Sequence, residues 1–232
     1  MRIHKYISLT GYCSRRETKR LIESGRITVN GVICNKETDV LEGDEVLIDN
    51  RPIPRKTSSI YLVFNKPVGI TCTANPEIEG NILECVQMPE RVFPVGRLDK
   101  ASQGLILLTN DGELANRISQ SDYGHEKEYE VTVDQPITSL FLLKMAEGVP
   151  ILDTMTKPAL TEYVSKYVFR ITLTQGLNRQ IRRMCKTLGY AVEKLERIRI
   201  MNIHLHALET GKWRVLETKE LLELKKSLNL SI

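Results

Sequence analysis

The sequence lacks a long apolar segment. Its 232 residues contain no uninterrupted run of about 18 apolar residues, which a membrane-spanning helix would require. The amino-terminal stretch MRIHKYISLTGYCSRRE also lacks the apolar core of a secretory signal. These absences indicate neither membrane insertion nor secretion, and we expect a cytoplasmic protein.

Cysteine is scarce and shows no pairing pattern. The five cysteines are an odd number and form no Cys-x-x-Cys pair, which argues against a disulfide framework and a thiolate zinc site. His204 and His206 could chelate a metal from one strand face, but no third ligand lies near them in the sequence. We therefore expect free, mostly buried thiols and no metal site.

The residues that are present fit a globular protein. Hydrophobic residues make up 41% and charged residues 27% of the chain, enough for a sizeable core, and the length suits one or two domains. A polar stretch with two prolines near residue 54 has no apolar periodicity. We therefore predict domains at residues 1–49 and 60–232, joined by a linker at 50–59.

Positive charge is concentrated at the amino terminus. The overall net charge of +4 is too small to indicate a nucleic-acid partner by itself. Residues 1–36, however, carry eight basic and two acidic residues, whereas residues 37–54 carry six acidic residues and one basic residue. The positive field therefore belongs to the first part of the first domain.

The first domain is expected to contain a short basic helix and a hairpin. Ser14 and Glu17 have the spacing of a capping box, in which each side chain bonds the backbone amide of the other, and Gly25 ends the helix. Asn30-Gly31 predicts a hairpin, with a third strand at residues 45–48. The helix has a broad basic face, either a solvated surface or a binding surface, made up of Arg15, Arg16, Lys19 and Arg20.

The second domain is predicted to be α+β, with a mixed, mainly antiparallel sheet. Strand-like runs occur at residues 61–64, 105–108, 129–133, 168–173, 191–195 and 199–205. Helical patterns occur at residues 111–119, 138–147, 178–188 and 218–228.

Two polar clusters of the second domain could carry chemistry. Asp99 is the only carboxylate of a glycine-bounded loop that precedes an apolar strand, and such loops commonly carry function. Taken alone, the Arg97-x-Asp99 pattern is more typical of a structural ion pair than of a catalytic site. The second cluster has helical spacing and forms one cationic stripe, which either binds phosphate or faces solvent: Arg179, Arg182, Arg183 and Lys186.

Four motifs, taken together, resemble one enzyme family. Their order and spacing are similar to those of the RsuA-type branch of ribosomal RNA pseudouridine synthases across nearly the whole chain. The basic first domain likewise resembles an S4 RNA-binding domain. The motifs are NKPVG at residues 65–69, GRLDK at 96–100, KEY at 127–129 and GLNRQIRRM at 176–184.

The resemblance implies a mechanism that uses no cofactor and no metal. Enzymes of this family break the bond between ribose C1′ and uracil N1, turn the base and rejoin it through C5. Asp99 matches their essential aspartate, which either attacks C1′ or abstracts a proton from the sugar. Arg182 matches the cation that opposes desolvation of this carboxylate. Tyr129 matches the tyrosine that stacks on the target base and either also removes its C5 proton or serves only as a stacking platform.

The resemblance also implies supporting and RNA-binding residues. Ile181 matches an apolar residue beneath the site, and Lys66-Pro67 matches a rigid turn that supports the aspartate loop. The residues expected to contact RNA are Arg15, Arg16, Lys19, Arg20, Arg97, Arg179, Arg183 and Lys186.

The expected substrate is a uridine of 23S ribosomal RNA, acted on by a monomer. A uridine in a tRNA anticodon arm or in 16S ribosomal RNA would require the same chemistry, so the motifs do not separate these targets. A noncatalytic RNA-binding or ribosome-assembly protein is a third hypothesis. The combination of Asp99, Tyr129 and Arg182 argues against it, because a binding module needs no acid beside an RNA-facing loop.

Overall fold

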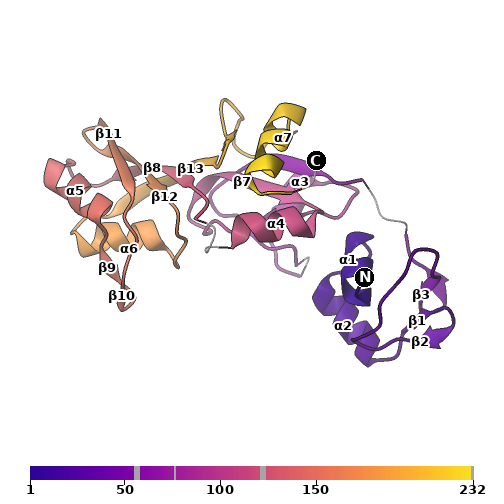
Figure 1. The fold of residues 1–232 in the computed structure, drawn as a ribbon. Coiled ribbons are helices and arrows are strands. Elements are labelled where there is room, and N and C mark those ends of the chain that lie inside the picture. Colours follow the sequence, from indigo (N-terminus) through magenta and orange to yellow (C-terminus); the bar gives the residue numbers. More distant parts are fainter. Residues whose placement is uncertain (55–57, 76, 121–123, 231–232) are drawn as a thin grey trace. The chain divides into compact units, whose positions relative to one another are not determined.

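The chain divides into two compact units. The computed structural model describes residues 1–54, 58–75, 77–120 and 124–230. The smaller unit consists mainly of residues 1–60, with 88–92 and 110–112, and the larger unit contains the remainder (Figure 1). Part of the predicted linker, residues 55–57, lies outside the described residues. Within the described ranges, no helix is long and apolar enough to cross a membrane.

The smaller unit contains two helices, α1 (Ile3–Leu9) and α2 (Arg15–Glu23). The hydroxyl of Ser14 accepts a hydrogen bond from the Glu17 amide at 3.1 Å, as predicted for the start of α2. The Glu17 carboxylate, however, accepts from Arg20 at 3.3 Å. The second half of the predicted capping box is therefore wrong, because a neighbouring cation one turn along the helix takes the carboxylate.

A four-stranded sheet with the order β2-β1-β3-β4 completes this unit. Its turn residues Asn30 and Gly31 have φ values of 50° and 79°, as the predicted hairpin requires. Strand β4 pairs with β3, so the sheet extends into the segment predicted to be a linker. The strands are Ile27–Val29 (β1), Val32–Ile33 (β2), Val46–Ile48 (β3) and Arg51–Pro52 (β4).

The larger unit is built on a nine-stranded mixed sheet with the order β11-β12-β8-β13-β7-β5-β15. Strand β14 pairs with β13, and β6 pairs with β7. The β13–β7 pair is parallel and its neighbours are antiparallel, which confirms the predicted fold class. The strands are Tyr61–Lys66 (β5), Phe93–Val95 (β6), Gln103–Thr109 (β7), Lys127–Val133 (β8), Leu160–Ser165 (β11), Val168–Leu173 (β12), Val192–Ile200 (β13), Ile203–His204 (β14) and Trp213–Val215 (β15), with Pro150–Ile151 (β9) and Thr154–Met155 (β10) as a separate pair.

Helices pack against this sheet around two apolar clusters. One cluster joins side chains of β5, β7, α4 and α7, and the other joins β8, β12, α5 and α6. Helix α6 starts later than predicted because Arg179, at its amino-terminal boundary, has a left-handed φ of 51°. The helices are Ile82–Val86 (α3), Gly112–Ser119 (α4), Ser139–Glu147 (α5), Gln180–Thr187 (α6) and Thr218–Ser227 (α7).

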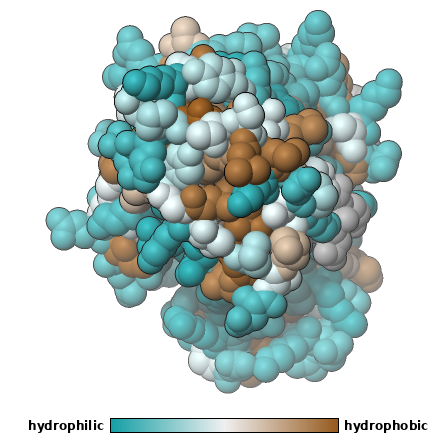
Figure 2. All heavy atoms as spheres, turned by 90° about the vertical axis from the view of Figure 1, so that its left-hand side faces the viewer, coloured by the Kyte–Doolittle hydropathy of each residue, from teal (hydrophilic) through white to brown (hydrophobic). Residues whose placement is uncertain are grey.

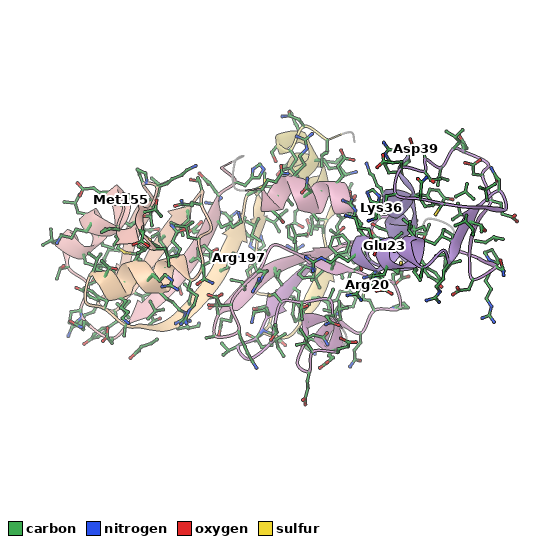
Figure 3. The ribbon with its side chains drawn as sticks, turned by 90° about the horizontal axis from the view of Figure 1, so that it is seen from below. Arg20, Glu23, Lys36, Asp39, Met155 and Arg197 are labelled. Atoms are coloured by element: carbon green, nitrogen blue, oxygen red, sulfur yellow. The ribbon has the colours of Figure 1, made fainter. Side chains whose placement is uncertain are left out.

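Apolar side chains are exposed at the end of the larger unit that contains α5, β10 and β11. Figure 2 shows such side chains gathered on this face. Met155 marks this end in Figure 3, whereas Arg197 lies in the middle of the unit. The exposed side chains include Leu140, Leu143, Met155 and Leu160, and none of them lines the pocket described below.

Candidate active site

A pocket of about 420 Å³ lies in the larger unit. Its walls come from the loop between β6 and β7, the start of β8, the start of α6 and the middle of β13. The structure therefore brings together segments that are far apart in the sequence. The predicted site residues that line it are Arg97, Asp99, Tyr129, Arg179 and Ile181, and they are joined by Lys127 and Arg197.

The loop that carries Asp99 is held through its backbone. The amide of Gly69 donates to the carbonyl oxygen of Lys100 at 2.7 Å. The Nη2 atom of Arg182 donates to the carbonyl oxygen of Ala101 at 2.8 Å. The two residues after Asp99 are thus bonded to separate parts of the fold, which limits the movement of the carboxylate.

Lys66 and Pro67 form the turn that reaches this loop. Lys66 is fully buried at the end of β5. Its ammonium group donates to the carbonyl oxygens of Pro67 at 2.7 Å and Ile70 at 2.9 Å, which closes the turn. Burial lowers the pKa of Lys66, and the negative charge of nearby Asp99 partly opposes this effect. This geometry favours the predicted supporting role of both residues.

Arg182 is connected to Asp99 through the loop backbone and not through a direct ion pair. Its Nη1 atom donates to the carbonyl oxygen of Val192 at 3.0 Å, while Nη2 holds Ala101. Burial and the charge of Arg179 lower the pKa of Arg182, and the charge of Asp99 raises it. Asp99 has no ion pair within 4.0 Å in the described part of the chain.

The basic residues predicted to form one stripe of a helix differ in their contacts. Arg179 precedes the helix with a left-handed backbone, and it lines the pocket. Arg182 binds backbone carbonyls, and Arg183 donates to the side chain of Asn178 at 3.1 Å. Only Lys186 is an exposed cation of the helix without such a contact among the described residues.

Tyr129 reaches the pocket because of the alternation of side chains along β8. Lys127 and Tyr129 line the pocket, whereas Glu128 and Glu130 point to the other face of the strand. There Glu128 accepts from Arg199 at 2.7 Å, and Glu130 accepts from Arg170 at 3.2 Å. These ion pairs join register partners on the opposite face, while Tyr129 faces the pocket.

Arg197 is a site residue that the sequence analysis missed. It is only 2% exposed, and it lies directly beside Tyr129 in the β13–β8 register. Its Nε atom donates to the carbonyl oxygen of Leu105 at 2.7 Å, and Nη1 donates to that of Arg97 at 3.4 Å. Its Nη2 atom is buried without a partner among the described residues. Arg197 therefore bonds both sides of the Asp99 loop.

Comparison with known proteins identifies the family. The RNA pseudouridylate synthase family matches residues 60–187, and the S4 domain family matches residues 1–46. The chain belongs to the RNA pseudouridylate synthase family. The predicted family, RNA-binding domain and enzyme class are thereby confirmed.

Relatives of this pseudouridine synthase narrow the resemblance to the RluF type. The dual-specificity RNA pseudouridine synthase RluF of Salmonella typhi is 51% identical over 97% of this chain and 78% of its own length. RluF of Escherichia coli K12 is 50% identical over 97% of this chain and 79% of its own length. A crystal structure of a pseudouridylate synthase matches with a TM-score of 0.72 at 29% identity, over 97% of this chain and 99% of that one.

The S4 domain of the synthase presents its basic helix to solvent. Arg15, Arg16 and Lys19 are exposed on α2 and form no ion pair within the described residues, whereas Arg20 pairs with Glu17. Figure 3 labels Arg20 on this helix. Side chains that lack a carboxylate partner remain free to bind phosphate.

The two paired histidines of the synthase have no third metal ligand beside them among the described residues. The rings of His204 and His206 stack with their centroids 5.4 Å apart. In the part of the chain that the structure describes, no three His, Cys, Asp or Glu side chains are grouped to hold a metal ion.

Proposed function

We propose that this synthase converts a specific uridine of 23S ribosomal RNA to pseudouridine, with Asp99 as the essential carboxylate. One observation carries the proposal: Asp99 is the single carboxylate among the described residues that line the pocket, and it shares this pocket with Tyr129. The pocket volume of about 420 Å³ suits one nucleoside. The similarity to RluF over 97% of the chain supports the choice of reaction.

The reaction needs an ionised Asp99 on either route. The C1′–N1 bond breaks with its electron pair going to the base, and a C1′–C5 bond then forms. The hydrogen on C5 is finally replaced by one on N1. Asp99 either attacks C1′ or takes a proton from the sugar. The charge of Asp99 raises the pKa of Arg182, and we assign Arg182 the role of the cation that faces this carboxylate.

Tyr129 is the proposed platform for the target base. Its ring lines the same pocket as Asp99, and a base that has been extruded from RNA is commonly held by stacking on an aromatic ring. We propose that its hydroxyl group relays the proton that leaves C5, passing its own proton on as it takes the new one, so that N1 finally gains a hydrogen. Ile181, which is buried at the start of α6, supports the pocket from below.

Binding to RNA provides the free energy needed to unstack the target base, which costs a few kcal/mol. Phosphate contacts are the proposed source. Around the pocket we assign them to Arg97, Arg179, Arg183 and Lys186, and in the S4 domain to Arg15, Arg16, Lys19 and Arg20. We propose that the enzyme works as a cytoplasmic monomer, with no metal or cofactor.

A second RNA substrate is favoured by the nature of the relatives. The RluF relatives are dual-specificity RNA pseudouridine synthases. We therefore include a uridine of a tRNA anticodon arm as a second target. A short single-stranded loop of this kind offers an accessible base without a duplex to open.

Site-resolved pseudouridine mapping tests the proposal. Total RNA from cells that lack the gene is compared after complementation with the wild type, Asp99→Asn or Asp153→Asn. Asp153 is an exposed residue that does not line the pocket, so its variant is the matched control. We expect the wild type and the control to restore a 23S site, and Asp99→Asn to restore none.

The same experiment separates the remaining alternatives. A restored tRNA site alongside the 23S site establishes dual specificity, whereas a restored 16S site refutes the proposed substrate. Restoration by Asp99→Asn would contradict the role of the carboxylate.

A further inference from the structure

The pocket contains more positive charge than its one carboxylate can balance. Among its described lining residues, four are cations, Arg97, Lys127, Arg179 and Arg197, and one is an anion, Asp99. Arg97 and Arg179 are exposed and can exchange their contacts with water. Lys127 is half-buried and Arg197 is buried. A charge withdrawn from water is costly unless it meets an opposite charge.

Lys127 has no carboxylate partner in the described part of the chain. The acidic neighbours on its strand, Glu128 and Glu130, point away and bind arginines. Among the described residues, its ammonium group donates one hydrogen bond, a long one of 3.4 Å, to the carbonyl oxygen of His125. Two further donor positions of the ammonium group are therefore available to a ligand in the pocket.

The position of Lys127 beside Tyr129 places it next to the target base and not next to the phosphate backbone of the RNA. Lys127 and Tyr129 are separated by one residue on β8, so their side chains stand side by side on one wall of the pocket. A base stacked on Tyr129 presents its edge, with two carbonyl oxygens, to neighbouring groups. Lys127 lies where a donor to that edge is needed.

The proposed reaction creates the missing anion at this place. When the C1′–N1 bond breaks, its electron pair passes to the uracil ring and is shared with the adjacent carbonyl oxygen. We infer that Lys127 is a further catalytic residue, which binds a carbonyl oxygen of the target uracil and stabilises the negative charge on the detached base. Lys127 keeps its proton throughout, because C5 supplies the hydrogen that N1 gains. This inference rests on the proposed function.

The electrostatics of the site agree with this role. Burial lowers the pKa of Lys127 to about 8, and the charge of Arg197 on β13 contributes. The other titratable groups around it are His125 before the strand, Tyr129 on the strand and Asp99 across the pocket. Lys127 is therefore charged at neutral pH and loses its charge in mildly alkaline solution. An arginine at this position would stay charged.

The test compares single-turnover rates on an RNA fragment that contains the mapped uridine. The variants are Lys127→Met, Lys127→Arg and, as a control, Lys144→Met. Lys144 is an exposed lysine of α5 that lies outside the pocket. We expect Lys127→Met to lower the rate about 100-fold, the effect of removing one preorganised donor, while the Kd for RNA changes less than threefold. Lys144→Met should match the wild type.

The pH dependence distinguishes catalysis from a structural role. In the wild type, the protonated fraction of a lysine with a pKa of about 8 falls roughly tenfold between pH 7 and pH 9. The single-turnover rate should fall by the same factor. The single-turnover rate of Lys127→Arg should fall less than threefold over the same pH range. Equal alkaline losses in both proteins, or a Lys127→Met rate within threefold of the wild type, would overturn the inference. A wild type that forms no pseudouridine would instead refute the proposed function.

Discussion

At Gly104 the backbone of β7 lies very close to the backbone of Arg197 on the neighbouring strand β13. A Cβ atom at this position would lie 2.4 Å from the carbonyl oxygen and 2.6 Å from the amide nitrogen of Arg197. The backbone of Gly104 also has a φ of +104°, which side chains of L-residues rarely adopt. The substitution Gly104→Ala should therefore strain the parallel β7–β13 pair that holds Arg197 in the site.

The size of the stability loss caused by Gly104→Ala follows from two separate energetic costs. A backbone conformation that suits only glycine costs about 1–3 kcal/mol with a Cβ atom present. Forcing extra volume into a packed interior costs about another 1–3 kcal/mol. We expect Gly104→Ala to lower the free energy of unfolding of the larger unit by about 2–6 kcal/mol. For a unit of this size the Tm should fall by roughly 4–24 °C.

Tryptophan fluorescence during urea unfolding is the assay. Trp213 is the only tryptophan of the chain, and it lies on β15, which pairs with β5 beside β7. Its signal therefore reports on the larger unit alone. Gly176→Ala is the matched control, because its Cβ atom would meet nothing within 4 Å and its φ is outside the positive range. A Gly104→Ala midpoint equal to that of the wild type, or an equal loss in Gly176→Ala, would refute the reasoning.

Three further outcomes can be measured on the purified protein. Exchange of Arg16 and Lys19 for Gln should weaken RNA binding and reduce the slope of log Kd against log salt by about 1.5, measured by filter binding. An unchanged slope would exclude phosphate contacts by these two residues. Burial raises the pKa of the Cys185 thiol to about 12, so iodoacetamide at pH 8 should label it only after unfolding, as read by mass spectrometry. Glu220 accepts two hydrogen bonds from Arg214, which lower its pKa. Glu220→Gln should therefore lower the free energy of unfolding by about 0.5–1 kcal/mol at pH 7. The difference from the wild type should vanish as the pH falls below the pKa of Glu220 in the folded protein, because the carboxylate is then protonated.

Features that depend on short-range chemistry could be predicted from the sequence. The Asn30-Gly31 turn needs only two residues with positive φ, and the structure has both. Helix α5 starts where predicted, because the Thr138 hydroxyl accepts from the Phe141 amide at 3.1 Å. In each case the signal and the structure that it determines lie within four residues of each other.

Elements that depend on tertiary packing could not be predicted in this way. Helix α1 has no capping hydrogen bond from a side chain, and its fully buried Ile3 and Ile7 belong to the core that also contains Leu21 of α2. Strand β11 is exposed along nearly all of its length and shows no alternation of burial. It exists because it pairs with β12, and a partner strand is not visible in the local sequence.

The same limit explains why Arg197 was missed. In a regular strand Arg197 and Arg199 would point to the same face. The register of β13 against β8 shifts between these two residues, so Arg197 lies beside Tyr129 while Arg199 binds Glu128. A bulge of this kind redirects side chains and is common next to active sites. Which of the two arginines enters the pocket therefore depends on one extra residue in a strand pairing, and no periodicity within residues 192–200 could reveal it.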